Sequence, residues 1–241
     1  MPQIVSALFK LPLLRELKPG WIDTARAIVQ GAVFQEMTRA HLWQGKCLNA
    51  GCGEGLYCSF LSSFPDLSEI VNLDLETPQL YYSRVDDRHQ EIKGSLTALP
   101  FAKETFDCCL CSEVIEHIEA DELAVAELAR VLKVGATLLL SVPTPPAPND
   151  PAHVREGYTY EQLSSLLERQ GFKIQCHAYC FYNPMRVLDT LWRWQYRVLG
   201  AEKRNYFPQF LVKGLGYCDR VLKVGKPWDL VVLARKESEI I

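Results

Sequence analysis

The stretch "CLNAGCGEGLYCSF", Cys47 to Phe60, decides the fold class of this chain. A short apolar run leads directly into glycines that alternate with other residues, at Gly51, Gly53 and Gly55. Glycines let the backbone turn tightly and approach a ligand without a Cβ in the way. The helical segment that follows offers its free N–H groups to the same ligand. The stretch therefore predicts a strand, a loop and a helix that bind a nucleotide-like molecule.

The spacing of the glycines excludes two common kinds of nucleotide-binding loop. A dinucleotide loop would have a third glycine at position 56, where Leu56 stands, and no G-K-[S/T] follows to make a P-loop. Asp74 comes about 20 residues after Gly51, at the end of the second predicted strand. A carboxylate at that place accepts hydrogen bonds from both hydroxyls of a ribose. The pattern predicts a ligand that carries a ribose.

Apolar runs alternate with helical segments along most of the chain. The predicted strands are 46–50, 69–76, 89–95, 105–114, 136–143, 172–180 and 228–235. The predicted helices are 22–43, 56–64, a segment from Pro78, 120–135 and 160–170. Strands that read as continuous apolar runs between helices indicate a mostly parallel sheet with both faces covered. Ligands of such α/β sheets bind beyond the carboxyl ends of the strands, where the unusual residues of this chain gather.

The amino-acid composition indicates which binding partners and which cellular compartment to expect. The chain has 241 residues and a net charge of -3, which gives no reason to expect nucleic acid as a partner. It has nine cysteines, an odd number, and its one C-x-x-C spacing, Cys108 to Cys111, falls within a predicted strand, so unpaired thiols in a reducing cytoplasm are the simpler interpretation. The N-terminus lacks the pattern of a signal peptide, and no apolar run approaches the ~20 residues of a membrane span. We expect a cytoplasmic protein.

Residues 183–226 interrupt the alternating pattern with two amphipathic segments rich in aromatic and basic side chains. We expect four regions: a helical cap at 1–44, a core at 45–182, this insertion at 183–226, and a last strand with a tail at 227–241. The insertion is a candidate acceptor lid or interface. Helices that pack an apolar face on the core are the simplest account, and a weak contact with a membrane surface is the alternative.

Five segments in order resemble one enzyme family: "LNAGCGEG", "VNLDLE", "LTALPFAKETFDCCLCSEVIEHI", "ELARVLKVGATLLLSVP" and "GYTYEQLSSLLERQGFKI". They are similar to class I S-adenosylmethionine-dependent methyltransferases of the type 11 kind, in particular to ubiquinone-biosynthesis O-methyltransferases. The resemblance covers roughly residues 45–180 and 228–235. It implies a Rossmann-like, doubly wound, seven-stranded mostly parallel sheet with helices on both faces, and a helical insertion before the last strand. It also implies S-adenosylmethionine as the cofactor.

The resemblance also implies a set of cofactor contacts. Asp74 would bind the ribose hydroxyls, and the methionine part would pass the glycine loop. The full implied set is Asn49, Gly51, Cys52, Gly53, Asp74, Leu75, Ser95, Leu96, Ser112 and Glu113. Asn49 and Ser95 stand where many members have Asp.

The segment "SEVIEHI" follows the fourth strand, where acceptor and cofactor should meet. If it is helical, Glu113 shares a face with Glu116 and His117. We expect His117 to act as a base beside Glu116, with no metal. The alternative is a divalent cation, because E-x-x-E-H resembles the metal-binding segment of ubiquinone-biosynthesis and small-RNA 2′-O-methyltransferases. The alternative ligands are Glu113, Glu116, His117 and His153, the last being the nearest match to a further histidine of the RNA enzymes.

Three function classes remain open. The favoured one is methyl transfer to a small or medium-sized apolar acceptor, on oxygen, by a monomer or homodimer. The second is metal-assisted 2′-O-methylation of RNA or another macromolecule, against which the acidic net charge stands. The third is a noncatalytic cofactor-binding regulatory subunit. Arg155, Tyr158 and Tyr160, in or just after a proline-rich loop at 143–159, are candidates for shaping the acceptor pocket.

Overall fold

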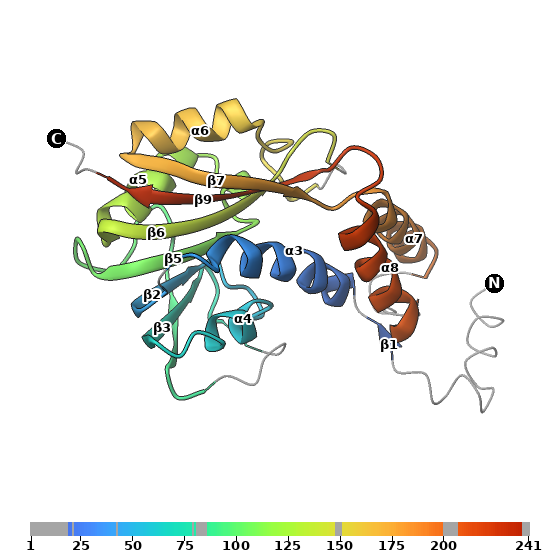
Figure 1. Cartoon of the computed structure of the whole chain (residues 1–241), viewed down its shortest axis with the longest axis horizontal. Coiled ribbons are helices and arrows are strands. Elements are labelled where there is room, and N and C mark those ends of the chain that lie inside the picture. Colours follow the sequence, from blue (N-terminus) through green and yellow to red (C-terminus); the bar gives the residue numbers. More distant parts are fainter. Residues whose placement is uncertain are drawn as a thin grey trace. The chain divides into compact units, whose positions relative to one another are not determined.

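The computed structural model describes residues 19–20, 22–41, 43–78, 80, 86–147, 151–199 and 207–237 (Figure 1). The described residues fall into two compact units. One contains the residues up to Ala32 together with Phe181–Lys226, and the other contains Val33–Cys180 and the residues from Pro227 on. The helix predicted from Pro78 falls on residues 79 and 81–85, which lie outside the described residues.

The larger unit is built on a seven-stranded sheet with the order β4-β3-β2-β5-β6-β9-β7. The strands are β2 (Gly45–Ala50), β3 (Leu67–Asp74), β4 (His89–Lys93), β5 (Phe106–Ser112), β6 (Leu132–Pro143), β7 (Phe172–Cys180) and β9 (Asp229–Lys236). The first five strands of this order pair in parallel, and β9 runs antiparallel to both β6 and β7. This is the predicted Rossmann-like sheet, so the expected fold class is confirmed.

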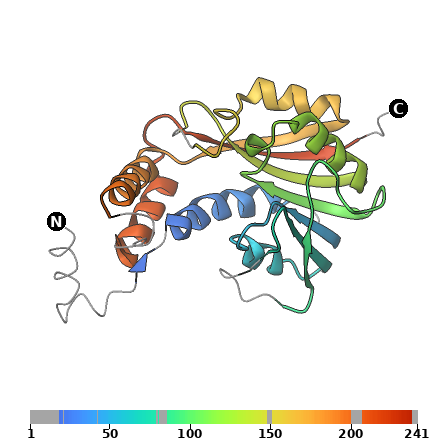
Figure 2. The same cartoon turned by 180° about the vertical axis from the view of Figure 1, so that it is seen from behind.

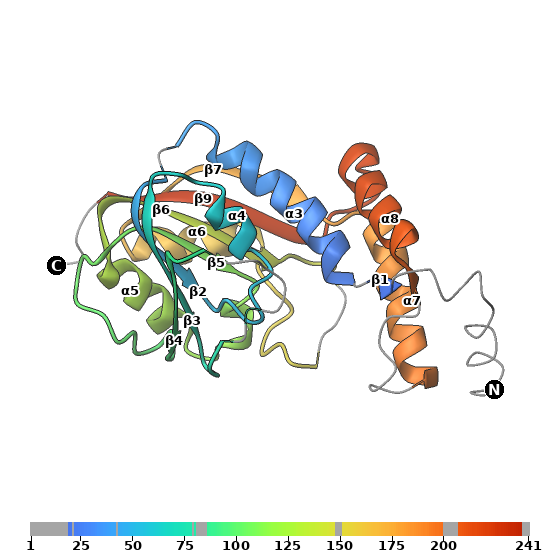
Figure 3. The same cartoon turned by 90° about the horizontal axis from the view of Figure 1, so that it is seen from below.

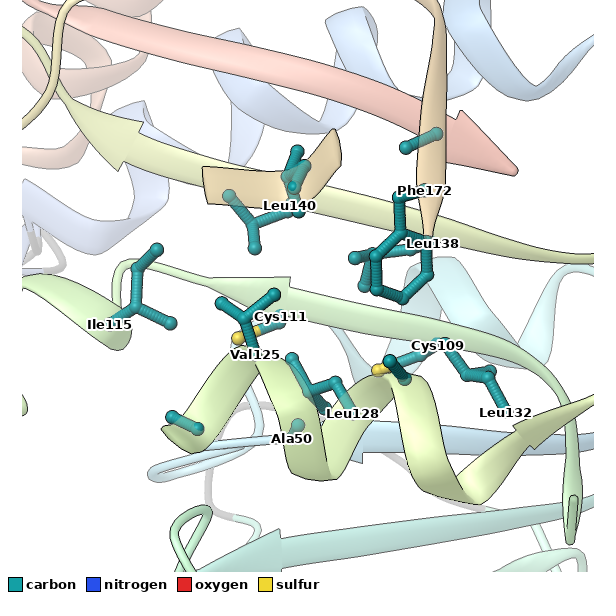
Figure 4. Packing of buried hydrophobic residues seen from close by; sticks show 14 of the residues in the cluster. Ala50, Cys109, Cys111, Ile115, Val125, Leu128, Leu132, Leu138, Leu140 and Phe172 are labelled. Atoms are coloured by element: carbon teal, nitrogen blue, oxygen red, sulfur yellow. The ribbon is translucent and has the colours of Figure 1, made fainter. Parts of the chain in front are cut away.

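Alternate residues of each strand enter opposite layers of the core. One layer joins the sheet to α5 (Asp121–Val131) and α6 (Tyr160–Arg169), through side chains such as Cys109, Leu138 and Leu140 (Figure 4). Figure 2 shows these two helices together over one face. On the other face lie α3 (Ile22–Thr38) and α4 (Cys58–Ser62) (Figure 3). An aromatic cluster links these two helices, and the Phe34 and Phe60 ring centroids lie 5.6 Å apart. Both faces are therefore covered, which is why inner strands such as β5 and β9 are buried along most of their length, whereas the edge strands β4 and β7 alternate with exposed residues.

The predicted helix over 120–135 is too long, because α5 ends at Val131 and β6 begins at the next residue. Leu132 pairs with Phe106 of β5, and its carbonyl accepts a hydrogen bond from the buried Nζ of Lys236 at 2.7 Å. Tertiary pairing thus takes precedence over the helical pattern of this segment.

The smaller unit contains α7 (Asn183–Leu199), α8 (Gln209–Leu222) and a two-stranded pairing of β1 (Pro19–Gly20) with β8 (Phe207–Pro208). Asp219 of α8 is fully buried, and its Oδ1 accepts hydrogen bonds from the N–H groups of Tyr182 (2.8 Å) and Met185 (3.0 Å). A carboxylate at the first turn of α7 satisfies N–H groups that have no partner within the helix. Asp219 therefore fastens α8 to the start of α7. Among the described residues, no helix is both long and apolar enough to cross a membrane.

Candidate active site

The loop after β2 presents its backbone at the carboxyl edge of the sheet. The N–H groups of Gly51 (2.8 Å) and Cys52 (3.0 Å) donate to the Leu73 carbonyl at the end of β3. The Gly53 N–H donates to Asp74 Oδ2 at 2.8 Å. Gly51 has a φ of 70° and stands against the side chain of Val114, so any Cβ at this position would collide with it. The loop is therefore held by β3 in a conformation that requires glycine.

Gly53 shows that this loop has room for a ligand. Its φ is 50°, and a Cβ built on it would meet nothing within 4 Å. A bare backbone that faces open space, next to the carboxylate of Asp74, fits a ligand that carries ribose hydroxyls. The residues present thus fit the cofactor that the sequence predicts.

Cys52 lies in the same loop and would be a nucleophile only as a thiolate. Burial, and secondly the nearby carboxylate of Asp74, raise the pKa of the Cys52 thiol far above its ordinary value. The thiol is therefore protonated at neutral pH and does not compete with an acceptor for an electrophilic methyl group.

Asn49 lies in the core near the end of β2, just before the loop. Its side chain is 4% exposed, and Nδ2 donates to Asn72 Oδ1 at 2.9 Å. The Asn72 amide in turn contacts His89 Nδ1 at 3.0 Å, and His89 Nε2 lies 2.9 Å from Ser62 Oγ. The structure therefore places Asn49 in a buried polar network between β2, β3 and β4.

The three residues predicted to lie at the adenine, Leu75, Ser95 and Leu96, differ in exposure and in their contacts. Leu75 is 65% exposed just after β3, whereas Leu96 is buried at 5%. Ser95 Oγ lies 2.8 Å from Thr97 Oγ1 and accepts a hydrogen bond from the Thr97 N–H at 3.2 Å. A ligand that used Ser95 would have to share this hydroxyl with the turn.

Glu113 turns toward β6 at the end of β5. Its φ is 56°, in the left-handed region, and its N–H donates to the Ser141 carbonyl at 3.0 Å. Ser141 Oγ donates to Glu113 Oε1 at 3.0 Å and lies 2.8 Å from Ser112 Oγ. Glu113 and Ser112 thus both contact the Ser141 hydroxyl of β6.

A second group of polar side chains forms two residues further on. A short 3₁₀ helix, η1 (Ile115–His117), carries Glu116, which is fully buried, and His117, whose Nε2 lies 3.7 Å from Glu116 Oε1. His153 approaches from the loop after β6, and its ring centroid lies 4.6 Å from that of His117. One ligand atom from each of these three residues lies within 4.8 Å of the others. The structure therefore brings together three of the four alternative metal ligands.

The tautomer of His117 follows from its backbone contact. His117 Nδ1 lies 2.9 Å from the Ala152 carbonyl oxygen. A carbonyl can only accept a hydrogen bond, so Nδ1 carries a proton, and in the neutral ring Nε2 is the nitrogen with the lone pair. That lone pair can take a proton from a hydroxyl or bind a cation.

Arg155 and Tyr158 hold the loop that carries His153. Arg155 donates to the carbonyls of Ile115 (3.2 Å) and Glu119 (3.0 Å), on either side of His117. The Tyr158 hydroxyl accepts from Arg155 at 2.6 Å and donates to Asp121 Oδ2 at 2.7 Å, and Arg155 also pairs with Asp121 at 2.8 Å. From the sequence we expected Arg155 and Tyr158 to shape the acceptor pocket, and we did not predict a role for Asp121.

Replacing Tyr158 with Phe should lower the free energy of unfolding by about 1–2 kcal/mol, because Asp121 and Arg155 lose a hydroxyl in a buried network. Urea unfolding monitored by circular dichroism measures this loss. Tyr160→Phe is the matched control, since the half-buried Tyr160 ring packs on His177 at 4.4 Å, and we expect a change within about 0.5 kcal/mol. Equal losses in the two variants would contradict the role given to Tyr158.

Part of the chain is similar to known methyltransferases. Residues 48–140 match the family model described as "Methyltransferase domain". A protein of Mycolicibacterium smegmatis named "Probable S-adenosylmethionine-dependent methyltransferase" is 31% identical over 156 residues, which cover 59% of this chain and 57% of the relative. An O-methyltransferase of Penicillium expansum is 25% identical over 173 residues, which cover 65% of this chain and 62% of the relative.

Solved structures agree on the fold. The S-adenosylmethionine-dependent methyltransferase of Mesorhizobium loti superposes with a TM-score of 0.55 at 18% identity, covering 86% of this chain and 99% of that one. Residues 48–140 are therefore similar to methyltransferase domains, and the fold is that of the class I S-adenosylmethionine-dependent methyltransferases, as the motifs predict. The chain spans a little over half the length of the mycobacterial relative.

Proposed function

We propose that this protein transfers a methyl group from S-adenosylmethionine to an oxygen of a small or medium-sized apolar acceptor, with His117 as the general base. The observation that carries the proposal is the contact of His117 Nδ1 with the Ala152 carbonyl at 2.9 Å, which assigns the proton of the neutral ring to Nδ1 and its lone pair to Nε2. The same ring lies just after β5, the strand that pairs with β2 and its glycine loop.

The cofactor is held, in this proposal, by the carboxyl ends of β2, β3 and β5. Asp74 binds the ribose hydroxyls, and the methionine part of the cofactor lies along the backbone of Gly51 to Gly53. Leu75, Ser95 and Leu96 surround the adenine. Ser112 and Glu113 lie near the ribose and the sulfonium, and Asn49 acts by supporting the loop through Asn72. When bound, the cofactor supplies a methyl group on a positively charged sulfur, already activated for displacement.

The chain itself has two tasks in such a reaction. It must orient the acceptor oxygen in line with the methyl group, and orientation is worth about 7–11 kcal/mol of a barrier. It must also take the hydroxyl proton, for which His117 Nε2 is the proposed acceptor atom. Glu116 Oε1, 3.7 Å from that nitrogen, stabilises the imidazolium that forms. The O-methyltransferase among the relatives supports oxygen as the acceptor atom.

A metal-assisted reaction is the second candidate, because Glu116, His117 and His153 place ligand atoms within 4.8 Å of one another. Imidazole and carboxylate groups suit several divalent cations. This arrangement favours 2′-O-methylation of RNA or another macromolecule as the alternative activity. Glu113, the fourth ligand of the alternative set, is not one of these three residues, and its carboxylate accepts a hydrogen bond from Ser141.

Isothermal titration with S-adenosylmethionine tests the proposal first, and we expect saturable binding of one molecule per chain. Product formation with radiolabelled cofactor and a panel of apolar hydroxyl compounds then tests the reaction. No heat at about 1 mM cofactor means binding weaker than about -4 kcal/mol and would overturn the proposal. Binding without turnover on any acceptor class would favour a regulatory subunit. A cytoplasmic location is part of the proposal and follows from the cysteine content.

A further inference from the structure

Exposed apolar side chains are concentrated in one short segment of the chain. The described residues include fourteen large hydrophobic side chains that are exposed, and ten of them lie between Val187 and Val224. These ten are Val187, Leu191, Trp194, Val198, Phe210, Leu211, Tyr217, Val221, Leu222 and Val224. Scattered exposed apolar residues are normal on a protein surface, but a concentration of this kind marks an interaction site.

The exposed residues of α7 form one stripe. Val187, Leu191, Trp194 and Val198 follow one another at spacings of four, three and four residues, which places them on a single face of the helix. Trp194 is 64% exposed. The other face of α7 supplies Leu188, which is fully buried. The helix therefore has two apolar faces, one packed and one exposed.

The exposed residues of α8 follow the same pattern. Phe210, Tyr217 and Val221 are spaced by seven and four residues and are 67%, 55% and 76% exposed. The opposite face carries Val212 and Asp219, both fully buried, and α8 packs against α7. The helix pair thus presents apolar and aromatic side chains from both of its members.

The exposed charged side chains among the described residues of this segment are all basic. The acidic side chains among its described residues are Asp189 and Asp219, and both are buried. Asp189 pairs with Arg193 at 2.8 Å, and Asp219 accepts hydrogen bonds from the start of α7. The exposed basic side chains are Arg197, Lys213, Arg220, Lys223 and Lys226. The surface of the helix pair is therefore basic, although the whole chain carries a net charge of -3.

We propose that the exposed stripes of α7 and α8 are a docking face for an anionic lipid surface. Apolar side chains flanked by Lys and Arg define helices that lie in the plane of a membrane interface. Trp194 and Tyr217 have the apolar body and polar tip that suit the headgroup level. Long basic stems reach from an apolar stripe toward lipid phosphates. The docking does not depend on methyl transfer and is tested without it.

A second copy of the chain is a less suitable occupant. Pairing this face with itself would bring five exposed cations from each copy against one another. An anionic surface instead neutralises them, and each Lys or Arg near such a surface contributes about 1 kcal/mol, or roughly a fivefold change in affinity.

Co-sedimentation of the full chain with lipid vesicles tests the proposal. We expect binding to phosphatidylcholine vesicles that contain phosphatidylserine, little binding to phosphatidylcholine alone, and a decrease as salt rises. Trp194→Ser combined with Val221→Ser should reduce the affinity at least tenfold. Lys213→Gln combined with Lys223→Gln should reduce it by about 25-fold.

Matched controls lie on the sheet unit. Val134 is an exposed apolar residue of β6, at 51%, and Lys173 is an exposed cation of β7. Val134→Ser and Lys173→Gln should both bind as the wild type does. No binding to anionic vesicles overturns the proposal, and so does equal binding by all variants. A dimer in solution that Trp194→Ser dissociates, without vesicle binding, would assign the face to a second copy instead.

Discussion

Asp74→Ala should weaken the binding of S-adenosylmethionine by roughly a hundredfold, with the sheet intact. Hydrogen bonds to a charged group contribute about 1.5–3 kcal/mol each, and in the proposed site the carboxylate accepts from two ribose hydroxyls. The variant also removes the acceptor of the Gly53 N–H at 2.8 Å, so the glycine loop loses one of its contacts with β3. Isothermal titration measures the affinity, and thermal unfolding reports whether the loop contact also stabilises the fold.

Two further variants separate these contributions. Asp74→Asn keeps an oxygen for the Gly53 N–H but removes the charge, so its affinity should fall between those of the wild type and Asp74→Ala. Glu69→Gln lies on the same strand, five residues before, where Glu69 pairs with Lys46 at 2.8 Å on the surface. We expect its affinity to equal that of the wild type. If Asp74→Ala bound as tightly as Glu69→Gln, Asp74 would have no part in ribose recognition.

The sheet could be predicted because its strands carry a simple signal. Each buried strand is a continuous apolar run, and the glycine loop and Asp74 stand where strands end. The helix over 120–135 was wrong at its C-terminus, because Leu132 continues the apolar pattern of α5 but pairs with Phe106 of β5. Pairing between distant segments does not show in local periodicity.

The site could be predicted only in part, and "SEVIEHI" shows why. Helical spacing placed Glu113 on one face with Glu116 and His117. In the structure Glu113 has a φ of 56° and the 3₁₀ helix begins only at Ile115, so Glu113 turns to Ser141. The spacing argument assumed a regular helix that the chain does not form.

Residues brought in by loops were the hardest to predict. His153 reaches His117 through a loop held by Arg155 and Tyr158, and Asp121 completes that contact from α5. Nothing in the local pattern near residue 117 points to position 153 or 121. The resemblance to metal-binding relatives supplied His153, and Asp121 had no signal at all.

His117→Ala should lower the rate of methyl transfer by about 10²–10⁴-fold and leave S-adenosylmethionine binding unchanged, because a general base contributes about that much. Single-turnover transfer to the acceptor found in the screen measures the rate. His177→Ala is the matched control, since this exposed histidine of β7 packs against Tyr160 and Tyr179 and should not change the rate. A rate for His117→Ala equal to that of this control would remove His117 from the reaction.

The two proposed roles of His117 Nε2, general base and metal ligand, predict different effects of replacing His153. If His117 is a base alone, His153→Ala should change the rate by less than about tenfold and a chelator should have no effect. If the cluster binds a cation, His153→Ala should lower the rate as His117→Ala does, chelation should abolish transfer, and titration with Mn²⁺ or Zn²⁺ should give heat that both variants lose. Because Nδ1 of His117 is held by the Ala152 carbonyl in either case, the orientation of the ring does not distinguish them. The effect of His153, whose ring lies 4.6 Å away, therefore decides between a proton acceptor and a metal ligand.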